Sequence, residues 1–287
     1  MARLLFPEKH SRMLSRSIES PEKSSLSGSL IIFISLAAFL AAVVTPGESI
    51  WTAGLFVLLM LVSLLGSSKQ ALHLSLFFFT LTATPLVSPL FRDWPFSLLV
   101  PLIAYFLIVV SVPKLRLTLS WLRPGYLGKN ILVLVTATAA VSGIALYLWN
   151  YALRPDLSRH LASIPLVPFW FYPFLGLGFA VLNAAMEEAA FRGIVMQSTD
   201  SAFGPGVLSL LLPAGLFGAL HFLQGFPRGA WGFGMAFIYG IMLGHIRRKS
   251  RGMLAPWLAH VCADLVIFAI LASIMPGKAH LSEAAGR

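Results

Sequence analysis

Residues 131–153 read ILVLVTATAAVSGIALYLWNYAL, a run without a single charged residue. The run is longer than the roughly 20 apolar residues that a helix needs to cross the hydrocarbon core of a bilayer. Because lipid offers no hydrogen-bonding partner to an exposed backbone, such a run must satisfy its own N–H and C=O groups as a helix. The sequence therefore predicts a transmembrane helix here.

The rest of the chain follows the same pattern. Hydrophobic residues make up 57% of the 287 positions, charged residues make up 11%, and the mean hydropathy is +0.83. A soluble domain carries about 25% charged residues, so this chain cannot cover a surface that faces water. Eight further apolar runs are visible: Leu30–Val44, Trp51–Leu65, Ala71–Val87, Pro95–Val112, Val167–Gln197, Val207–Phe222, Trp231–Ile246 and Leu254–Met275. We expect an all-α, polytopic bundle of about eight or nine transmembrane helices.

Polarity divides the chain into four parts. Residues 1–29 are a polar leader, and residues 30–129 form a first group of transmembrane helices. Residues 130–275 form a second, chemically richer core, and residues 276–287 are a C-terminal tail. The apolar runs of the first group contain almost no ionisable side chain. His73 lies near the end of one of these runs, and we expect it at the membrane interface.

The net charge of +10 comes from Lys and Arg clusters between the apolar runs. We interpret these clusters as topology signals and lipid-headgroup contacts, because positive residues collect in cytoplasmic loops. With nine spans, the leader, Lys69, residues 114–129 and residues 247–251 all lie on one side, so the N-terminus is expected in the cytoplasm. No basic face with interleaved aromatic residues is present to bind nucleic acid. The bilayer itself is the expected partner of these surfaces.

Ionisable side chains occur at three places inside the later runs, where burial is costly and points to a function. The first place includes Glu187, Glu188 and Arg192. Glu188 and Arg192 are four residues apart, so they share a helix face and can pair. Glu187 points about 100° away and is left to face a cavity as a candidate base. Alternatively, the helix ends near Arg192 and all three charges lie among lipid headgroups.

The second place is His221, which shares a helix face with Phe217. A lone His on an apolar helix is more often a structural hydrogen bonder than a catalyst. The third place combines His260 and Asp264, again four residues apart. Such a pair can orient an imidazole, bind a metal ion or stabilise a reacting carbonyl, or it can be a buried polar clasp between helices.

Depth in the membrane connects these three places. Glu187 and His221 lie equally far before and after the turn at Gly204. Two antiparallel helices joined at this turn would bring them to a similar depth. His260 follows the basic residues 247–251 by about nine residues, so it also lies within the membrane. One wet pocket accounts for all three places.

Together these residues resemble a known family. Glu-Glu-x-x-x-Arg, Phe-x-x-x-His and His-x-x-x-Asp, in this order on consecutive hydrophobic helices, look like the CPBP family. Its members are the CAAX prenyl endopeptidase and bacteriocin-processing intramembrane proteases, also called the Abi group. The resemblance covers about residues 165–275. It implies an intramembrane endopeptidase, which we expect in a bacterial inner membrane.

The resemblance also implies a glutamate-type mechanism. Glu187 would act as the general base on a water molecule that His221 helps to hold and polarise. Glu188 would pair with Arg192 and position Glu187. The substrate would be a peptide or protein with a membrane-proximal cleavage site, such as a lipid-modified C-terminus, a bacteriocin leader or a sorting anchor.

His260 and Asp264 would stabilise the oxyanion in this mechanism. Prenyl endopeptidases usually carry Asn in place of Asp264, and an ionised carboxylate cannot donate a hydrogen bond. Asp264 would then be protonated, or it would only orient His260. The set Glu187, His221, His260 and Asp264 could instead hold zinc. We expect no cofactor, with a zinc-dependent protease as the alternative.

Two other functions fit the same residues. A non-catalytic immunity or scaffold protein would keep the polar cluster for helix packing. A proton-coupled transporter would use Glu187 and the histidines as a proton relay. The sequence has no visible inverted repeat, which many transporters have.

Overall fold

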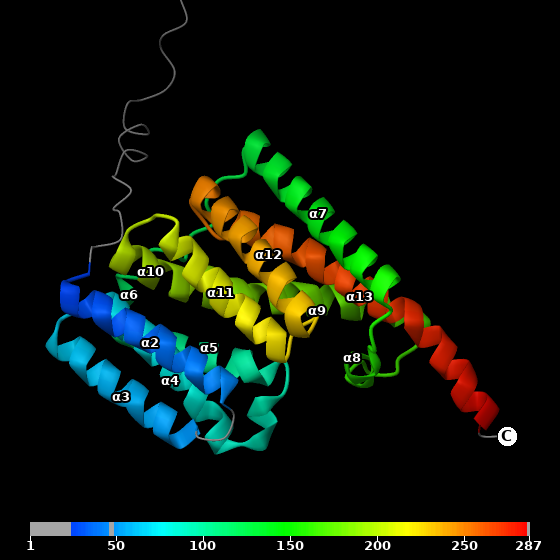
Figure 1. Ribbon diagram of the computed structural model, residues 1–287, viewed down its shortest axis with the longest axis horizontal. Helices are drawn as coiled ribbons and strands as arrows, with labels where there is room; N and C mark the ends of the chain where they lie inside the picture. The colour runs from blue at the N-terminus through cyan, green and yellow to red at the C-terminus, as the bar shows by residue number, and fades with distance from the viewer. Residues whose placement is uncertain (1–23, 46–48, 286–287) are drawn as a thin grey trace, which may run out of the picture.

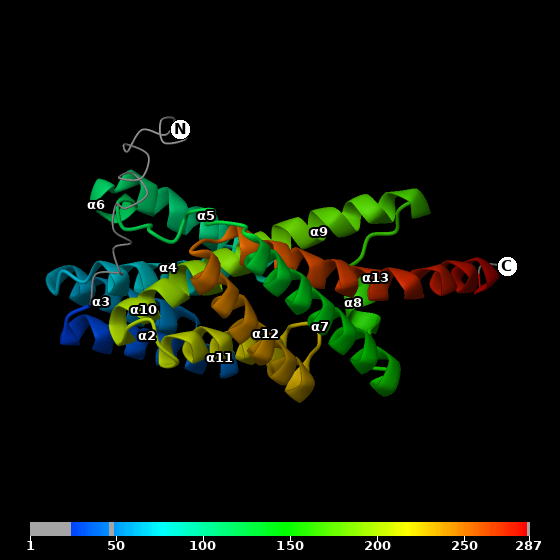
Figure 2. The same ribbon diagram turned by 90° about the horizontal axis from the view of Figure 1, so that it is seen from above.

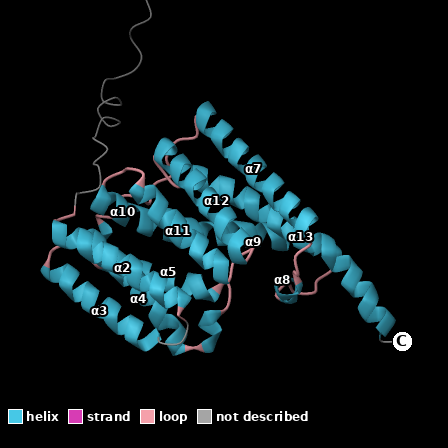
Figure 3. Cartoon of the chain, viewed as in Figure 1, coloured by secondary structure: helices cyan, strands magenta, loops and turns pink. Residues whose placement is uncertain are grey.

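The computed structural model describes residues 24–45 and 49–285 of the chain. Most of the predicted leader, residues 1–23, and the last two residues of the predicted tail lie outside this part. The regular structure of the described residues is entirely helical, as Figure 3 shows. The predicted all-α class is therefore confirmed.

Each of the nine predicted apolar runs corresponds to a helix of the structure. The helices are α2 (Leu26–Val44), α3 (Ser49–Leu65), α4 (Lys69–Val87), α5 (Phe96–Ser111), α7 (Lys129–Leu153), α9 (Tyr172–Glu187) continuing into α10 (Met196–Phe203), α11 (Leu208–Leu223), α12 (Gly229–Ser250) and α13 (Leu254–Ala285). Four short elements connect them: 3₁₀ turns at Pro89–Arg92 and Phe169–Phe171, α6 (Pro113–Arg116) and α8 (Ser158–Ala162).

The outer faces of these helices are apolar. Leu58 and Leu61 on α3 and Val133 and Ile144 on α7 are each more than half exposed. Within the described residues, six helical stretches are long and apolar enough to cross a membrane, and three apolar helices are shorter. Large exposed aliphatic side chains on such helices are suited to lipid rather than water. The protein is an integral multi-pass membrane protein.

The helices form two groups that share a core. Among helices α2–α5, blue to teal in Figure 1, α2, α3 and α4 contact one another and α5 contacts α4, whereas α11 contacts α12, and α13 contacts both α7 and α9. Figure 2 shows the same helices from above, with α10 and α11 overlapping α2 and α4 in this view. Phe77 and Phe78 of α4 belong to one buried cluster with Ile194 and Phe217 from the second group. The first group of helices therefore packs against one side of the second group.

His73, which the sequence places near the end of an apolar run, packs inside the protein. Its side chain is buried on α4. Its Nδ1 lies 2.7 Å from the hydroxyl of Tyr105, and its Nε2 lies 2.7 Å from the hydroxyl of Thr118. The distance of His73 from the helix end does not determine the direction in which its side chain points, and its depth at the membrane interface stays a prediction. Here two hydroxyl groups replace water as hydrogen-bonding partners.

The helix that carries Glu187 changes its geometry in the middle. Tyr172–Phe203 is continuous, but the segment Glu188–Val195 within it is π-helical. Gly193 in this segment packs against Trp121, and a Cβ atom there would lie 2.8 Å from the indole ring. Segments of π-helix are rare and are frequent at functional sites. The wide turns follow directly after Glu187.

A second group of charged residues joins α10 to the end of α12. Arg248 donates hydrogen bonds to Asp200 Oδ1 at 2.7 Å and to Ser209 Oγ at 2.8 Å. Arg247 Nη1 lies 3.7 Å from Asp200 Oδ2. We call Asp200, Ser209, Arg247 and Arg248 the turn cluster. The interpretation as headgroup contacts is wrong for these two arginines, since their side chains are only 13% and 24% exposed and pair within the protein.

Candidate active site

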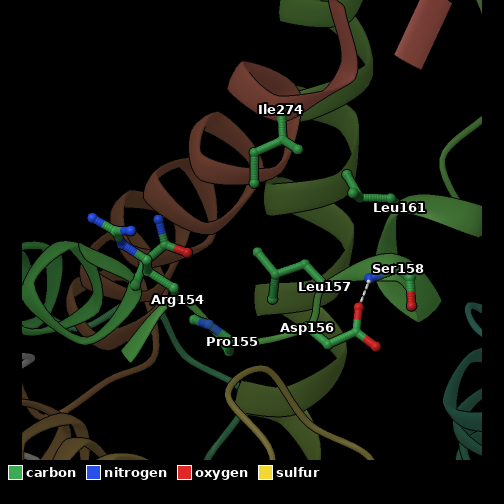
Figure 4. A pocket seen from close by; sticks show the side chains of 8 residues that line it. Arg154, Pro155, Asp156, Leu157, Ser158, Leu161 and Ile274 are labelled. Atoms are coloured by element: carbon green, nitrogen blue, oxygen red, sulfur yellow. Dashed lines mark hydrogen bonds between the residues drawn. The ribbon is translucent and has the colours of Figure 1, made fainter. Parts of the chain in front are cut away.

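Two pockets differ sharply in their lining. The smaller one, of about 400 Å³, lies at the end of α7 and is shown in Figure 4. Asp156 Oδ1 accepts a hydrogen bond from the backbone N–H of Ser158 there, at the start of α8. Arg154, Leu161 and Ile274 also line this pocket, but no predicted site residue does. It is separate from the chemistry that the sequence predicts.

The larger cavity, of about 1280 Å³, collects the predicted site residues. Its lining combines α2, α4 and the start of α5 with α9, α11, α12 and α13. Four of the six predicted residues line it: Glu187, His221, His260 and Asp264. Glu188 and Arg192 lie behind this wall and are 2% exposed. The structure thus brings the three predicted places together around one cavity.

Glu188 is the centre of a buried ion-pair network. Its Oε1 accepts a hydrogen bond from Arg192 Nη1 at 2.9 Å, as the four-residue spacing predicts. The same oxygen lies 2.8 Å from His260 Nδ1. An ionised carboxylate only accepts hydrogen bonds, so Nδ1 of His260 carries a proton. Glu188 therefore fixes the orientation of the imidazole.

The other nitrogen of His260 faces two more carboxylates. Nε2 lies 3.4 Å from Glu187 Oε2 and 3.8 Å from Asp264 Oδ1. Glu187 is the more open of the two, because its side chain is 19% exposed whereas that of Asp264 is 3% exposed. Both carboxylates line the cavity, and Glu187 is the more accessible of the two.

His221 approaches the cavity from α11 by a different route. Its Nδ1 donates a hydrogen bond to the carbonyl oxygen of Phe217 at 3.0 Å. In a neutral ring this leaves Nε2 unprotonated and able to accept. The ring of Phe217 lies 4.3 Å from His221 and also stacks under the guanidinium of Arg192, at 4.7 Å. Phe217 therefore packs between the imidazole and the buried ion pair.

Two polar residues of the site were not predicted from the sequence. Asn183 Nδ2 donates a hydrogen bond to Asp264 Oδ2 at 3.1 Å. The hydroxyl of Tyr239 donates to the carbonyl of Ala259 at 3.1 Å, and its ring lies 5.4 Å from that of His260. The position of Asn183, one helical turn before Glu187, was a signal that the same face was polar.

Most polar side chains of this site form hydrogen bonds or close charge contacts with one another. In the described part of the chain, no group of three or more His, Cys, Asp or Glu side chains is arranged so that it could hold a metal ion. The zinc alternative, with Glu187, His221, His260 and Asp264 as ligands, stays a prediction. Cys262 is exposed, although it stands between His260 and Asp264 in the sequence.

Comparison with known proteins gives the site its context. Residues 168–266 match the family model described as type II CAAX prenyl endopeptidase Rce1-like. No curated protein and no solved structure matched the chain. The matched segment begins just before α9, ends within α13 and contains all six predicted site residues. Membership of this family implies a membrane protease that acts on a protein substrate. Residues 168–266 form a domain of the Rce1-like type II CAAX prenyl endopeptidase family, within the CPBP or Abi group.

Proposed function

We propose that the protein is an intramembrane endopeptidase that hydrolyses a peptide bond of a membrane-associated or lipid-modified protein with a water molecule activated by Glu187. One observation carries the proposal. Glu187 lines a large cavity beside His260, whereas its neighbour Glu188 is sealed in a buried ion pair. A base must reach its water molecule, and of these two carboxylates only Glu187 lines the cavity.

The chemistry begins when Glu187 takes a proton from water while the water oxygen attacks the carbonyl carbon of the substrate. General-base catalysis of this kind contributes about 10²–10⁴-fold to a rate. His221 Nε2 can accept a hydrogen bond and help to hold the water. The C–N bond then breaks, and the proton on Glu187 passes to the leaving amine. The oxygen of the water ends in the new carboxylate.

The oxyanion of the intermediate requires a hydrogen-bond donor nearby. His260 Nε2 is flanked by Glu187 and Asp264, and two carboxylates favour an N–H group at that atom. Such a group, held in a water-poor site, stabilises developing negative charge. Asp264 accepts a hydrogen bond from Asn183, which supports an orienting role for Asp264 rather than a role as the oxyanion donor.

The cavity supports a large and largely apolar substrate. Its volume of about 1280 Å³ exceeds the roughly 300–1,000 Å³ typical of small-molecule sites. Phe39, Phe77 and Phe78 of the first helix group line it together with the site residues. This lining suits a hydrophobic peptide segment or an attached lipid better than a small polar metabolite.

The direct test is peptide cleavage by the purified protein in lipid vesicles. We would offer a panel of quenched fluorescent peptides: a prenylated CAAX peptide, an acylated peptide and a peptide with a hydrophobic C-terminal anchor. The wild type is expected to cleave at least one, and in H₂¹⁸O the new carboxylate should carry ¹⁸O. His221→Ala should lower turnover by about 10²-fold. Failure to cleave any of these peptides, or cleavage without ¹⁸O incorporation, would count against the proposal.

Metal dependence is tested on the same reaction. Because we propose a metal-free reaction, we expect turnover to survive dialysis against 1,10-phenanthroline. Elemental analysis of the purified protein should find no stoichiometric zinc. One zinc per chain that is lost in Asp264→Ala, together with inhibition by the chelator, would replace the glutamate mechanism by the zinc-dependent alternative.

A further inference from the structure

Helices α9 and α13 run antiparallel and meet in a ladder of three side-chain pairs. The pairs are Phe179 with Phe268, Asn183 with Asp264, and Glu187 with His260. On each helix the members are four residues apart, so every rung is one turn from the next. The phenyl centroids are 6.2 Å apart, the amide nitrogen lies 3.1 Å from the carboxylate, and the carboxylate of the last pair lies 3.4 Å from the imidazole. All six side chains line the large cavity.

Trp94, from the first helix group, contacts two residues of this ladder. Trp94 lies between the 3₁₀ turn Pro89–Arg92 and α5, outside the segment that matches the protease family. Its indole Nε1 donates a hydrogen bond to Asn183 Oδ1 at 3.0 Å. Its ring centroid lies 5.2 Å from that of Phe179. Trp94 lines the cavity and is 48% exposed, so it covers the two rungs that are further from Glu187.

The contact with Trp94 determines the orientation of the Asn183 amide. An indole N–H can only donate a hydrogen bond, so the amide oxygen of Asn183 must face Trp94. The amide nitrogen then faces Asp264, as observed. If the amide rotated by half a turn, its oxygen would face the carboxylate and its nitrogen would face the indole N–H. Both hydrogen bonds would be lost.

We propose that Trp94 and Asn183 are positioning residues of the active site. Trp94 sets the amide of Asn183, Asn183 holds Asp264, and Asp264 helps to orient His260 beside Glu187. The first helix group therefore contributes to catalysis as well as lining the cavity. This inference rests on the proposed protease function, and the experiment below separates the two.

The first arm measures turnover with the fastest peptide of the panel. Trp94→Phe keeps an aromatic ring against Phe179 but removes the N–H donor. We expect its kcat to fall about 3–10-fold, with KM within about twofold of the wild type, because one hydrogen bond to a neutral partner is lost. Asn183→Ala should lower kcat about 10–30-fold, since it removes the hydrogen bonds of Asn183 with both Trp94 and Asp264. Trp51→Phe, a change at an exposed tryptophan on α3, is the matched control and should be neutral.

The double variant Trp94→Phe/Asn183→Ala decides whether Trp94 acts through Asn183. If it does, kcat of the double variant equals that of Asn183→Ala, because Trp94 has no amide left to orient. Multiplied losses in the double variant would overturn the inference. So would a kcat of Trp94→Phe equal to that of the wild type, or an effect confined to KM.

The second arm needs no substrate. In protein labelled with ¹⁵N at the indole nitrogens, the resonance of Trp94 is assigned by its absence in Trp94→Phe. Its N–H should exchange with solvent more slowly in the wild type than in Asn183→Ala. Equal exchange in the two proteins would contradict the hydrogen bond itself. If Glu187→Gln retains turnover, the proposed function fails whatever Trp94 does. If Glu187→Gln is inactive and Trp94→Phe is not impaired, only this inference fails.

Discussion

One continuous helix, Tyr172–Phe203, contributes carboxylates to two largely buried groups of charges, whose other members include residues of α12 and α13. The first, here called the cavity cluster, consists of Glu187, Glu188, Arg192 and His260. The second is the turn cluster around Asp200 and Arg248. Both combine carboxylates with arginine at hydrogen-bonding distance, at 2.9 Å between Arg192 and Glu188 and at 2.7 Å between Arg248 and Asp200. Charge and burial alone do not distinguish them.

The difference lies in what each cluster leaves open. In the turn cluster, Arg248 also bonds to Ser209 and to the carbonyl of Gly206, and no member lines the large cavity. In the cavity cluster, Arg192 and Glu188 are sealed while Glu187 and His260 line the cavity. A buried charge therefore indicates a site when a second, unsealed carboxylate stands beside it. The turn cluster is better explained as a clamp that holds α12 against the turn between α10 and α11.

The largest effect on stability is expected from Arg192→Met. This substitution leaves Glu188 buried without its cationic partner, and breaking a buried ion pair costs about 3–5 kcal/mol. Turnover should be lost as well, because Glu188 orients His260. Unfolding in mixed micelles with increasing SDS measures the loss of stability. Glu188→Gln/Arg192→Met should recover much of the stability but not the turnover. Wild-type stability of Arg192→Met would contradict the buried ion pair between Arg192 and Glu188.

A smaller effect, on stability alone, is expected from Asp200→Asn. The variant weakens the hydrogen bonds and charge pairing of two arginines that are partly exposed, so we expect a loss of about 1–3 kcal/mol. Turnover per folded molecule should stay at the wild-type value. The same SDS titration and the peptide assay measure both quantities. A selective loss of turnover at unchanged stability would remove the distinction between the clusters.

The smallest effect is expected from Cys262→Ser. Cys262 is exposed on α13, although its sequence neighbours belong to the site. A surface substitution of this size usually changes stability by less than about 0.5 kcal/mol, and turnover should not change. Alkylation of the wild type with N-ethylmaleimide should also leave cleavage intact. Inactivation that Cys262→Ser abolishes would show that a helix face that does not line the cavity takes part in the reaction.

Helical spacing explains what could be predicted of the site. The pairing of Glu188 with Arg192 and the common cavity of Glu187, His221 and His260 follow from four-residue spacing and equal depth, which are local properties of a helix. The nine helical stretches of the described residues that match apolar runs follow from those runs. The roles of these residues in catalysis stay predictions that the experiments above test.

Contacts between distant segments could not be predicted from the spacing of residues within one helix. The bond between Asn183 and Asp264 depends on the register of α9 against α13, and that of Trp94 depends on how the two helix groups dock. The burial of His73 and the pairing of Arg248 with Asp200 have the same origin. Gly193 in the π-helical segment after Glu187 packs closely against Trp121, which comes from a distant part of the sequence. A sequence read one helix at a time contains none of these distances.

We propose that Glu187, rather than the burial of charge as such, gives this site its protease activity. The most direct measurement compares turnover and stability of Glu187→Gln with those of Asp200→Asn in the same vesicles. Glu187→Gln should lose at least about 10²-fold in turnover while its unfolding stays within about 1 kcal/mol of the wild type. Asp200→Asn should instead keep the wild-type turnover and lose about 1–3 kcal/mol of stability. Wild-type turnover in a folded Glu187→Gln protein would contradict the account.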